Sequence, residues 1–436
     1  MSVFSSSLSI RRVVLPDIRL LSIFILSLLI YRSSIYDIIY RSSIYSQYQK
    51  KYYIMNLVHN FIKKNGDNMQ FGFKIGTKVL FGKGCLIQNK ELVAKCGKRA
   101  LIVTGKNSAK ASGALSHVEE ILKEYNIDYS IYDRVENNPS LENVAEGGKA
   151  AREFKADFII GIGGGSPLDA SKAIAVLAVN DIEPLDLYKN VFENKPLPIV
   201  AIPTTAGTGS EVTPYSILTR DDIKTKMSFG NEDTFPKLAF IDATYTESMP
   251  YETAVDTAVD ALSHAMEGYL SKRSTPVSDV LALEAMKVFS ECTNAIIDNN
   301  IDFNIREKLL YVSMLGGMVI SHTGTTIIHG LGYSLTYFKG IPHGRANGYF
   351  MQEYLKFNYE AVGEKINKIL ELFKVSSIDE FGDIIEKMVK KDLSLSSEEI
   401  KNYAALTMKQ RSTSYNARQV NEKDLVEILE KTFLMK

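Results

Sequence analysis

The sequence contains little cysteine, and this scarcity limits the kinds of site it can build. Its 436 residues include only Cys85, Cys96 and Cys292, which form no CxxC pair and cannot all pair internally because their number is odd. A cysteine-rich metal site is therefore excluded, and any tightly held ion must use histidine and carboxylate ligands. The three residues suit small apolar positions in a reducing compartment, so we expect a cytoplasmic protein.

The chain also lacks an excess of charge of either sign. Basic and acidic residues number 51 each. The first 68 residues hold nine basic and three acidic ones, which leaves 42 basic and 48 acidic residues from position 69 onward. This mildly acidic body argues against broad nucleic-acid binding. The length is sufficient for two domains with sizeable cores.

No hydrophobic run is long enough to span a bilayer. Residues 20–31 are uncharged between Arg19 and Arg32, but a spanning helix needs about 20 apolar residues. A near repeat of YRSSIY follows at 31–36 and 40–45, which is low-complexity sequence without a core of its own. We expect residues 1–68 to lie outside the fold, with translation starting at Met69 or Met55. The alternative is a membrane-anchoring tail, whereas the folded part should not contact a membrane.

Strand and helix patterns alternate between residues 69 and 246. A strand pair is predicted over Phe71 to Gly84, single strands at 99–105, 128–132 and 157–162, and helices at 113–125 and 141–154. Alternation of this kind predicts a doubly wound α/β domain.

Two polar turns follow predicted strands in this half. The first, GIGGGSPLDASK at 161–172, leads into an alanine-rich helix; glycines let the backbone approach a phosphate, and the helix amino terminus supplies free N–H groups. Ser166 stands where G-x-G-x-x-G requires glycine, so alone this turn is a weak nucleotide signal. The second, PTTAGTGSE at 203–211, taken alone reads as a solvated hairpin loop.

From residue 247 onward the pattern is helical. Apolar residues recur at i, i+3 and i+4 over 280–289, 305–318, 364–373, 381–389 and 424–434. Ser377 with Glu380 and Ser396 with Glu399 predict capping boxes at helix starts. We expect an α-helical domain over 247–436, with the active site in the cleft between the halves.

Four potential metal ligands lie within residues 255–343. Asp260 and His264 are four apart in a segment without proline, so a helix places them on one face. His329 and His343 follow. One carboxylate and three imidazoles suit a borderline divalent ion such as iron(II), zinc or cobalt. The alternative is an ordinary surface or capping pair at 260 and 264.

These segments resemble a known family across nearly all of residues 69–436. VDALSHAMEGY (259–269), GTTIIHGLGYSL (324–335), IPHGRAN (341–347), GGGSPLDASKA and PTTAGTGSE are similar to segments of the iron-containing (group III) alcohol dehydrogenases. The resemblance implies a Rossmann-like dinucleotide-binding domain at 69–246 followed by an α-helical metal-binding domain at 247–436, the dehydroquinate synthase-like fold. The resemblance also implies that the metal ligands are Asp260, His264, His329 and His343.

The same resemblance implies where the dinucleotide lies. The expected cofactor-binding residues are Gly105, Lys106, Ser108, Gly163, Gly164, Gly165, Ser166, Asp169, Thr204, Thr205, Thr208 and Lys226. NAD-preferring relatives often carry an aspartate where this chain has Gly105. Because Gly105 leaves space for a 2′-phosphate and its neighbours offer donors, we expect NADP rather than NAD. The alternative is that Gly105 merely ends a strand.

The expected activity is hydride transfer between NAD(P)(H) and a small primary alcohol, diol or aldehyde, by a homodimer or larger homo-oligomer. Iron(II) is the expected metal, with zinc, cobalt or nickel as alternatives. The chain departs from many relatives at Tyr333, which replaces a histidine facing the substrate and leaves a possible substrate contact. The alternatives are an enzyme of the dehydroquinate synthase or glycerol dehydrogenase type, or a catalytically inactive nucleotide-binding scaffold.

Overall fold

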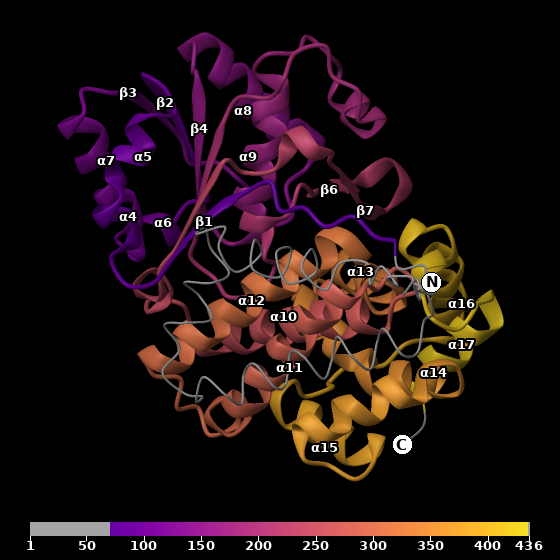
Figure 1. Cartoon of the computed structure of the whole chain (residues 1–436). Coiled ribbons are helices and arrows are strands. Elements are labelled where there is room, and N and C mark those ends of the chain that lie inside the picture. The colour runs from indigo at the N-terminus through magenta and orange to yellow at the C-terminus, as the bar shows by residue number, and fades with distance from the viewer. Residues whose placement is uncertain (1–69, 435–436) are drawn as a thin grey trace, which may run out of the picture. The chain divides into compact units, whose positions relative to one another are not determined.

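The computed structural model describes residues 70–434, so the expected start site or membrane anchor within residues 1–68 lies outside the described part. Within 70–434 no helix is both long and apolar enough to cross a membrane. The described chain begins with alternating strands and helices and continues, after residue 250, with helices (Figure 1).

Six parallel strands form one sheet in the order β1-β8-β5-β4-β2-β3. Their bounds are β1 (Lys78–Phe81), β2 (Arg99–Thr104), β3 (Asp128–Tyr132), β4 (Phe158–Gly163), β5 (Ile199–Pro203) and β8 (Leu238–Ile241). In this order β4 lies between β2 and β5, with Val103 opposite Gly161 and Gly161 opposite Ala201. The carboxyl ends of these three strands therefore meet at one edge of the sheet.

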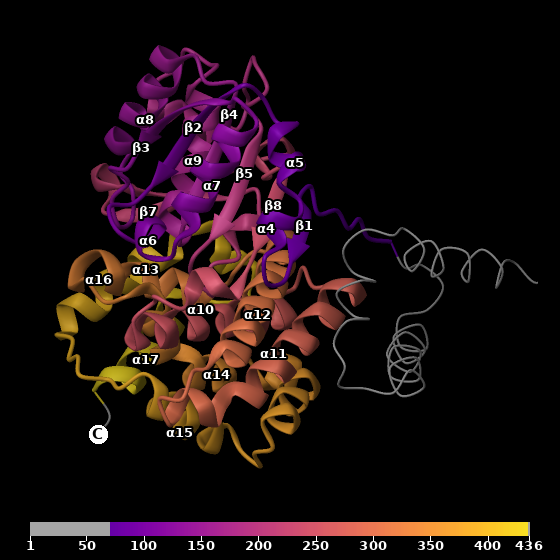
Figure 2. The same ribbon diagram turned by 90° about the vertical axis from the view of Figure 1, so that its left-hand side faces the viewer.

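Helices cover both faces of the sheet because successive strand side chains point in opposite directions. On β2, Ile102 joins the core under α4 (Cys85–Gln88), α5 (Lys90–Ala94), α6 (Ser108–Ala111) and α7 (Ala114–Glu124). Its neighbours Leu101 and Val103 join the core under α8 (Leu141–Phe154) and α9 (Gly165–Leu177). The ribbon shows α8 and α9 on the other side of the sheet from α7 (Figure 1 and Figure 2). The predicted doubly wound α/β arrangement is confirmed.

The prediction of a strand pair over Phe71 to Gly84 was wrong. Only β1 forms in that stretch, and a chain turn leads from it directly into α4. Gly82 and Gly84 adopt φ values of +122° and +72°, which L side chains rarely adopt, so these glycines end the strand. The described chain holds one antiparallel pair, β6 (Ser216–Arg220) with β7 (Thr225–Phe229).

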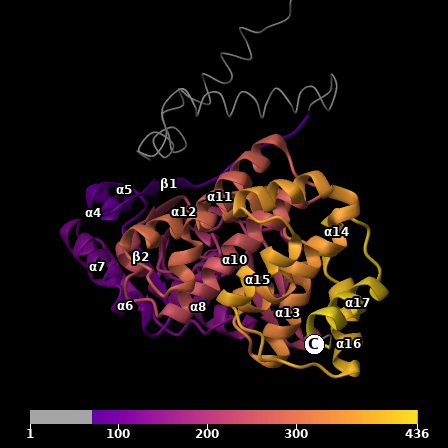
Figure 3. The same ribbon diagram turned by 90° about the horizontal axis from the view of Figure 1, so that it is seen from below.

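The carboxy-terminal part consists of helices packed around α10 (Tyr251–Leu270), which contacts α11 (Pro276–Ile297), α12 (Phe303–Thr323) and α14 (His343–Phe373) (Figure 3). The remaining α-helices are α13 (Ile327–Lys339), α15 (Ile378–Met388), α16 (Ser397–Met408) and α17 (Glu422–Phe433). Short 3-10 helices are η1 (Pro184–Lys189), η2 (Ser210–Val212), η3 (Asp221–Ile223), η4 (Glu232–Thr234), η5 (Ala243–Thr246) and η6 (Arg411–Tyr415). Each predicted helix lies within one of these elements or, at its end, within a residue of it.

One of the two predicted capping boxes is confirmed. At α16, the Ser396 side chain accepts from the Glu399 backbone and the Glu399 carboxylate accepts from Ser396 N in return. At α15, Ser377 caps the helix by accepting from Glu380 N at 3.1 Å, but the Glu380 carboxylate accepts from Ser376 N instead. The prediction of a capping box at Ser377 was therefore wrong in one of its two hydrogen bonds, because Ser376 N takes the place of Ser377 N as the donor to Glu380.

Candidate functional site: two phosphate-type turns beside a histidine and carboxylate cluster

Three loops gather at the carboxyl edge of the sheet. They follow the neighbouring strands β2, β4 and β5 and contain residues 105–108, 164–166 and 204–208. The predicted cofactor residues of the two polar turns and of the Gly105 loop are thus brought to one edge. In open parallel sheets this edge is where ligands bind.

The glycines of the first turn allow the loops to pack closely. A Cβ on Gly164 would lie 3.1 Å from Thr205 Oγ1, and a Cβ on Gly165 would lie 2.7 Å from Thr208 Cγ2. Gly163 has a φ of +151°, and its carbonyl accepts from Thr204 N at 2.9 Å. These contacts leave the N-terminal N–H groups of α9 next to the second turn, as an anion-binding site requires.

Asp169 belongs to a buried network rather than to an open loop. Its Oδ1 accepts from Ser210 Oγ at 2.5 Å, and its Oδ2 accepts from Ile217 N at 3.2 Å. The fully buried Lys172 donates to Ser210 Oγ at 2.7 Å and to the Tyr215 carbonyl at 2.5 Å. Burial lowers the pKa of Lys172 to about 8, against the nearby charge of Asp169. This network ties α9 to the second turn.

The second turn presents polar atoms that the described residues leave unpaired. Thr204 Oγ1 and Glu211 Oε1 are buried without a hydrogen-bond partner within residues 70–434. Burial raises the pKa of Glu211 to about 7. Buried polar groups are nearly always hydrogen-bonded, so an orphaned hydroxyl at this edge fits a site whose partner is a bound molecule. The edge therefore fits a dinucleotide.

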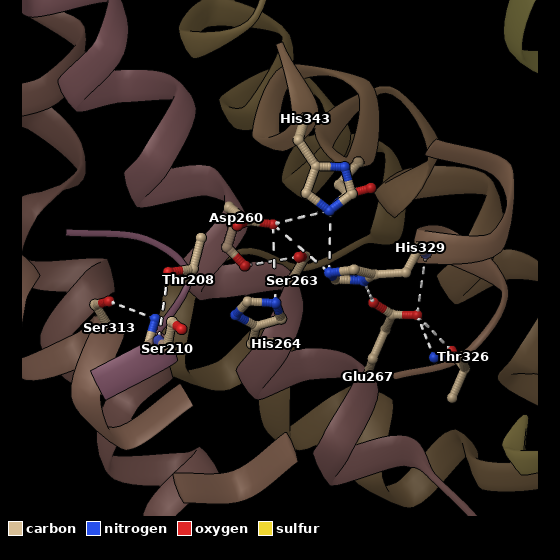
Figure 4. Close-up of polar contacts among 12 residues, drawn as sticks. Thr208, Ser210, Asp260, Ser263, His264, Glu267, Ser313, Thr326, His329 and His343 are labelled. Atoms are coloured by element: carbon tan, nitrogen blue, oxygen red, sulfur yellow. Dashed lines mark hydrogen bonds and ion pairs between the residues drawn. The ribbon is translucent and has the colours of Figure 1, made fainter. Parts of the chain in front are cut away.

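The four predicted metal ligands converge in the helical part (Figure 4). Helix α10 carries Asp260 and His264 one turn apart, α13 carries His329, and α14 begins with His343. Asp260 Oδ1 lies between 3.6 and 3.9 Å from the Nε2 atoms of all three histidines. Single ligand atoms of Asp260, His329 and His343 all fall within 4.8 Å of one another. Atoms bound to one ion at about 2.1 Å are roughly 3–4 Å apart, so these three residues suit a divalent cation. His264 lies outside this group of three and approaches it at Asp260 Oδ1, 3.9 Å from its Nε2.

The charges of this cluster favour a positive ion. Burial opposes the charge on Asp260, but the surrounding imidazoles outweigh it and hold the pKa below its ordinary value. Burial lowers the pKa of His264 to about 4. At His329 burial is outweighed by the carboxylates of Glu267 and Asp260, which raise its pKa to about 9. Two buried carboxylates thus attract positive charge to this point, which the donor chemistry of iron(II) or zinc matches.

Two residues in contact with the cluster escaped sequence reasoning. Glu267 is fully buried on α10, and its carboxylate accepts a hydrogen bond from His329 Nδ1. Asn347 on α14 donates from Nδ2 to Asp260 Oδ1 at 2.9 Å. The only signal in the sequence is spacing: Glu267 follows His264 by three residues, and Asn347 follows His343 by four, so each shares a helix face with a predicted ligand.

Tyr333 and Lys226 lie between the cluster and the dinucleotide edge. The Tyr333 ring stacks on His343 with centroids 5.3 Å apart, and Lys226 Nζ lies 5.4 Å from the ring centroid. Burial lowers the pKa of Lys226, and the charges of Asp169 and Asp260 oppose that shift. His322 lies elsewhere, in the last turn of α12, where it stacks on Phe73 at 4.1 Å as a helix-end residue.

The second turn packs directly on α10, which carries Asp260 and His264, and on the neighbouring helix α12. A Cβ on Gly207 would meet Thr257 of α10 at 2.7 Å, one turn before Asp260. Gly209 N donates to Ser313 Oγ of α12 at 3.2 Å, a contact drawn in Figure 4. The turn that suits a dinucleotide and the residues that suit a metal ion are therefore adjacent in the structure.

Comparisons with known proteins identify the family. The family model of the iron-containing alcohol dehydrogenases matches residues 76–243. The model of the carboxy-terminal part of the Fe-containing alcohol dehydrogenase family matches residues 254–433. Together the two models cover both the strand-containing and the helical part.

Individual relatives and solved structures agree. The NADPH-dependent butanol dehydrogenase of Clostridium saccharobutylicum is 30% identical over 380 residues, which cover 82% of this chain and 97% of that protein. The lactaldehyde reductase of Escherichia coli K12 is 30% identical over 80% of this chain and 96% of its own. The crystal structure of an iron-containing alcohol dehydrogenase from Thermotoga maritima matches with a TM-score of 0.79 and 39% identity, covering 84% of this chain and all of that one. The chain belongs to the iron-containing alcohol dehydrogenase family.

Proposed function

We propose that this chain is a metal-dependent alcohol dehydrogenase or aldehyde reductase that transfers hydride between NADP(H) and a small primary alcohol, diol or aldehyde. The observation that carries the proposal is the packing of the Thr204–Thr208 turn on α10, one helical turn from Asp260. The residues suited to a dinucleotide and those suited to a divalent ion are thereby neighbours. Butanol dehydrogenase and lactaldehyde reductase among the relatives support small aliphatic substrates.

In this proposal the metal is held by Asp260, His264, His329 and His343. When bound, the ion supplies Lewis-acid polarisation of the alcohol or carbonyl oxygen, and the nicotinamide supplies or accepts the hydride. Asp260, His264 and His329 are buried and His343 is half-buried, and this burial strengthens the electrostatic effect of the cluster. Iron(II) is the proposed native metal because of the family, and zinc, cobalt and nickel share the same ligand preferences.

The cofactor is proposed to lie along the carboxyl edge of the sheet. Gly163, Gly164, Gly165 and Ser166 face the pyrophosphate with the free N–H groups of α9, and Thr204, Thr205 and Thr208 bind the nicotinamide half beside Lys226. Asp169 acts through Ser210, since its carboxylate is already bonded there. The proposal of NADP depends on Gly105, Lys106 and Ser108 at the end of β2. A Cβ on Gly105 would meet only Val135 O at 3.6 Å and Pro167 at 3.9 Å, so this position has room for a larger group.

The cofactor preference is tested with Gly105→Asp. An aspartate here would repel a 2′-phosphate, so kcat/KM for NADPH should fall at least tenfold while the value for NADH holds or rises. Gly72→Asp, at a position with no atom within 4 Å of an added Cβ, is the matched control. A wild-type kcat/KM for NADH equal to or above that for NADPH would contradict the NADP assignment.

Tyr333 is proposed to contact the substrate. It lies against His343, and burial raises the pKa of its phenol, so at neutral pH the group is a hydrogen-bond donor. The residue that many relatives use to exchange a proton is therefore replaced by one that orients the substrate oxygen. Proton exchange is left to water or to the cofactor ribose.

The central experiment compares histidine variants. His329→Ala and His343→Ala should each lose bound metal, measured by inductively coupled plasma mass spectrometry, and lose aldehyde-dependent NADPH oxidation. His322→Ala, on α12 away from the cluster, should keep both. Retention of wild-type metal content and activity by either ligand variant would overturn the ligand assignment.

Net consumption of NADPH also separates the proposal from its rivals. An enzyme of the dehydroquinate synthase type recycles its cofactor within one turnover and shows no net consumption. An inactive scaffold shows neither turnover nor metal. We further propose a cytoplasmic homo-oligomer. The cysteines of the described residues are all free, which fits a reducing compartment, and light scattering of the purified chain measures the assembly.

A further inference from the structure

A carboxylate on α10 joins the start of α13 to one metal-ligand candidate. Glu267 has no exposed surface, and its two oxygens have separate partners (Figure 4). Oε1 accepts from Thr326 N and from Thr326 Oγ1, both at 2.7 Å. Oε2 accepts from His329 Nδ1.

The first oxygen replaces a missing helix cap. Helix α13 begins at Ile327 after Thr326, and the Thr326 side chain makes no capping bond to its own helix. Helix starts leave free N–H groups and a partial positive charge. Glu267 Oε1 meets this requirement from the neighbouring helix, also reaching His329 N at 3.4 Å. This contact fixes the position of α13 relative to α10.

The second oxygen acts on the imidazole. An ionised carboxylate can only accept, so the proton of a neutral His329 must reside on Nδ1. Nε2 then presents its lone pair toward Asp260 Oδ1, 3.6 Å away. We propose that Glu267 is a positioning residue that fixes the tautomer and ring orientation of His329 for metal binding; this inference rests on the metal-dependent function proposed above.

The pairing is specific within the described residues. Within residues 70–434 the titratable side chain bonded to Glu267 is His329, and no lysine or arginine forms an ion pair with this carboxylate. Burying a carboxylate without such a partner is costly. A cap alone could be made by Thr326 with an ordinary side-chain bond, so the cost of a buried acid indicates a second role. Mutation of a residue that is hydrogen-bonded to a metal-ligating histidine typically weakens metal affinity by about 10- to 100-fold.

Glu267→Gln separates the two roles. The amide oxygen can replace Oε1 as the cap, which leaves the NH2 group facing His329 Nδ1. A donor at that place makes Nδ1 an acceptor and moves the proton to Nε2, which is the tautomer unable to bind metal. The variant should therefore keep the helix cap and the packing while weakening metal binding.

The experiment measures Co²⁺ and Zn²⁺ affinity of the chelator-stripped full chain by competition with a chromogenic chelator, with the visible absorption of the Co²⁺ form as a second readout. Glu267→Gln should raise Kd by about 10- to 100-fold and alter the Co²⁺ spectrum. Asp279→Asn is the matched control, because Asp279 is a half-buried carboxylate on α11 that accepts from Lys365 Nζ of α14 at 2.8 Å. It should leave Kd within twofold of wild type.

Each outcome is decisive. An unchanged Kd in Glu267→Gln overturns the inference, as does an equal loss in Asp279→Asn. Should Glu267→Gln not fold, Glu267→Asp decides alone, since it keeps the charge but withdraws the oxygen from His329: a tenfold weaker Kd supports the inference, and an unchanged one overturns it. Failure of the wild-type chain to bind metal would refute the proposed function itself, which is a distinguishable result.

Discussion

Gly344 controls how closely α14 approaches α10. It follows His343 at the start of α14, and a Cβ at this position would lie 1.8 Å from Asp256 O and 2.9 Å from Asp260 Cβ. Real Cβ contacts are essentially never shorter than 3.0 Å. Gly344→Ala must therefore separate the two helices locally by more than about 1 Å, because the contact on α10 is backbone and cannot rotate away.

That displacement acts directly on the metal site. Metal–ligand distances tolerate roughly ±0.2 Å, and catalytic groups about 0.5 Å, so a shift above 1 Å should remove His343 from the shared set. We expect kcat/KM to fall by about 100-fold or more, bound metal to fall in parallel, and the free energy of unfolding to drop by about 1–3 kcal/mol.

The matched control is Gly363→Ala, in the second part of α14, directly after the kink at the non-helical Val362. A Cβ there would meet only the Tyr359 ring, at 3.5 Å or more, which is ordinary contact. This variant should keep its activity and its metal, with a stability equal to or slightly above wild type because alanine is the better helix former. Urea denaturation, metal analysis and NADPH oxidation measure all three quantities. A Gly344→Ala protein with full metal content and wild-type kcat/KM would refute the reasoning.

Three further predictions follow from buried groups. Burial raises the pKa of Glu211 from 4.5 to about 7, so the stabilising contribution of its protonated form is complete below pH 4.5 and is lost as the pH rises through 7. Glu211→Gln should therefore be more stable than wild type by up to about 3 kcal/mol at pH 8 but not at pH 4.5. A difference in urea midpoints that does not change with pH would contradict this. Tyr333→Phe should lower kcat/KM by roughly 2- to 10-fold, the worth of one neutral hydrogen bond, without loss of metal; unchanged kinetics would remove Tyr333 from the substrate contacts. Dialysis against a chelator should abolish aldehyde reduction and lower the melting temperature, and re-addition of Fe²⁺ should restore both; activity that survives complete metal removal would exclude a metal-dependent reaction.

The local pattern of the chain carries most of its secondary structure. Strand β3 and helix α8 begin and end at the predicted residues, because alternation and helical spacing depend on neighbouring residues. Helix α14 shows the limit: only its last third was predicted, yet it begins at His343. Its first turns contain Gly344 and Gly348, which weaken a helical signal locally but are required where α14 lies against α10 and Val389.

The residues of the functional site likewise fall into those that the sequence indicated and those that only the packing brought together. Resemblance of short segments pointed to Asp260, His264, His329 and His343, since each lies in a recognisable string of residues. Glu267 and Asn347 carry no such mark. Their roles exist only because α10, α13 and α14 pack so that a carboxylate and an amide reach across helices.

The sequence by itself therefore determined the α/β-then-helical order and the kinds of ligand available, because these depend on residue type and short-range spacing. Only the tertiary structure decided which side chains meet. Residues 260, 329 and 343 are separated by up to 83 positions in the chain, and it is the glycine-lined approach of α14 to α10, together with the Glu267 bond to α13, that brings their ligand atoms within 4.8 Å. Contacts of that range depend on packing between helices, which no local pattern specifies.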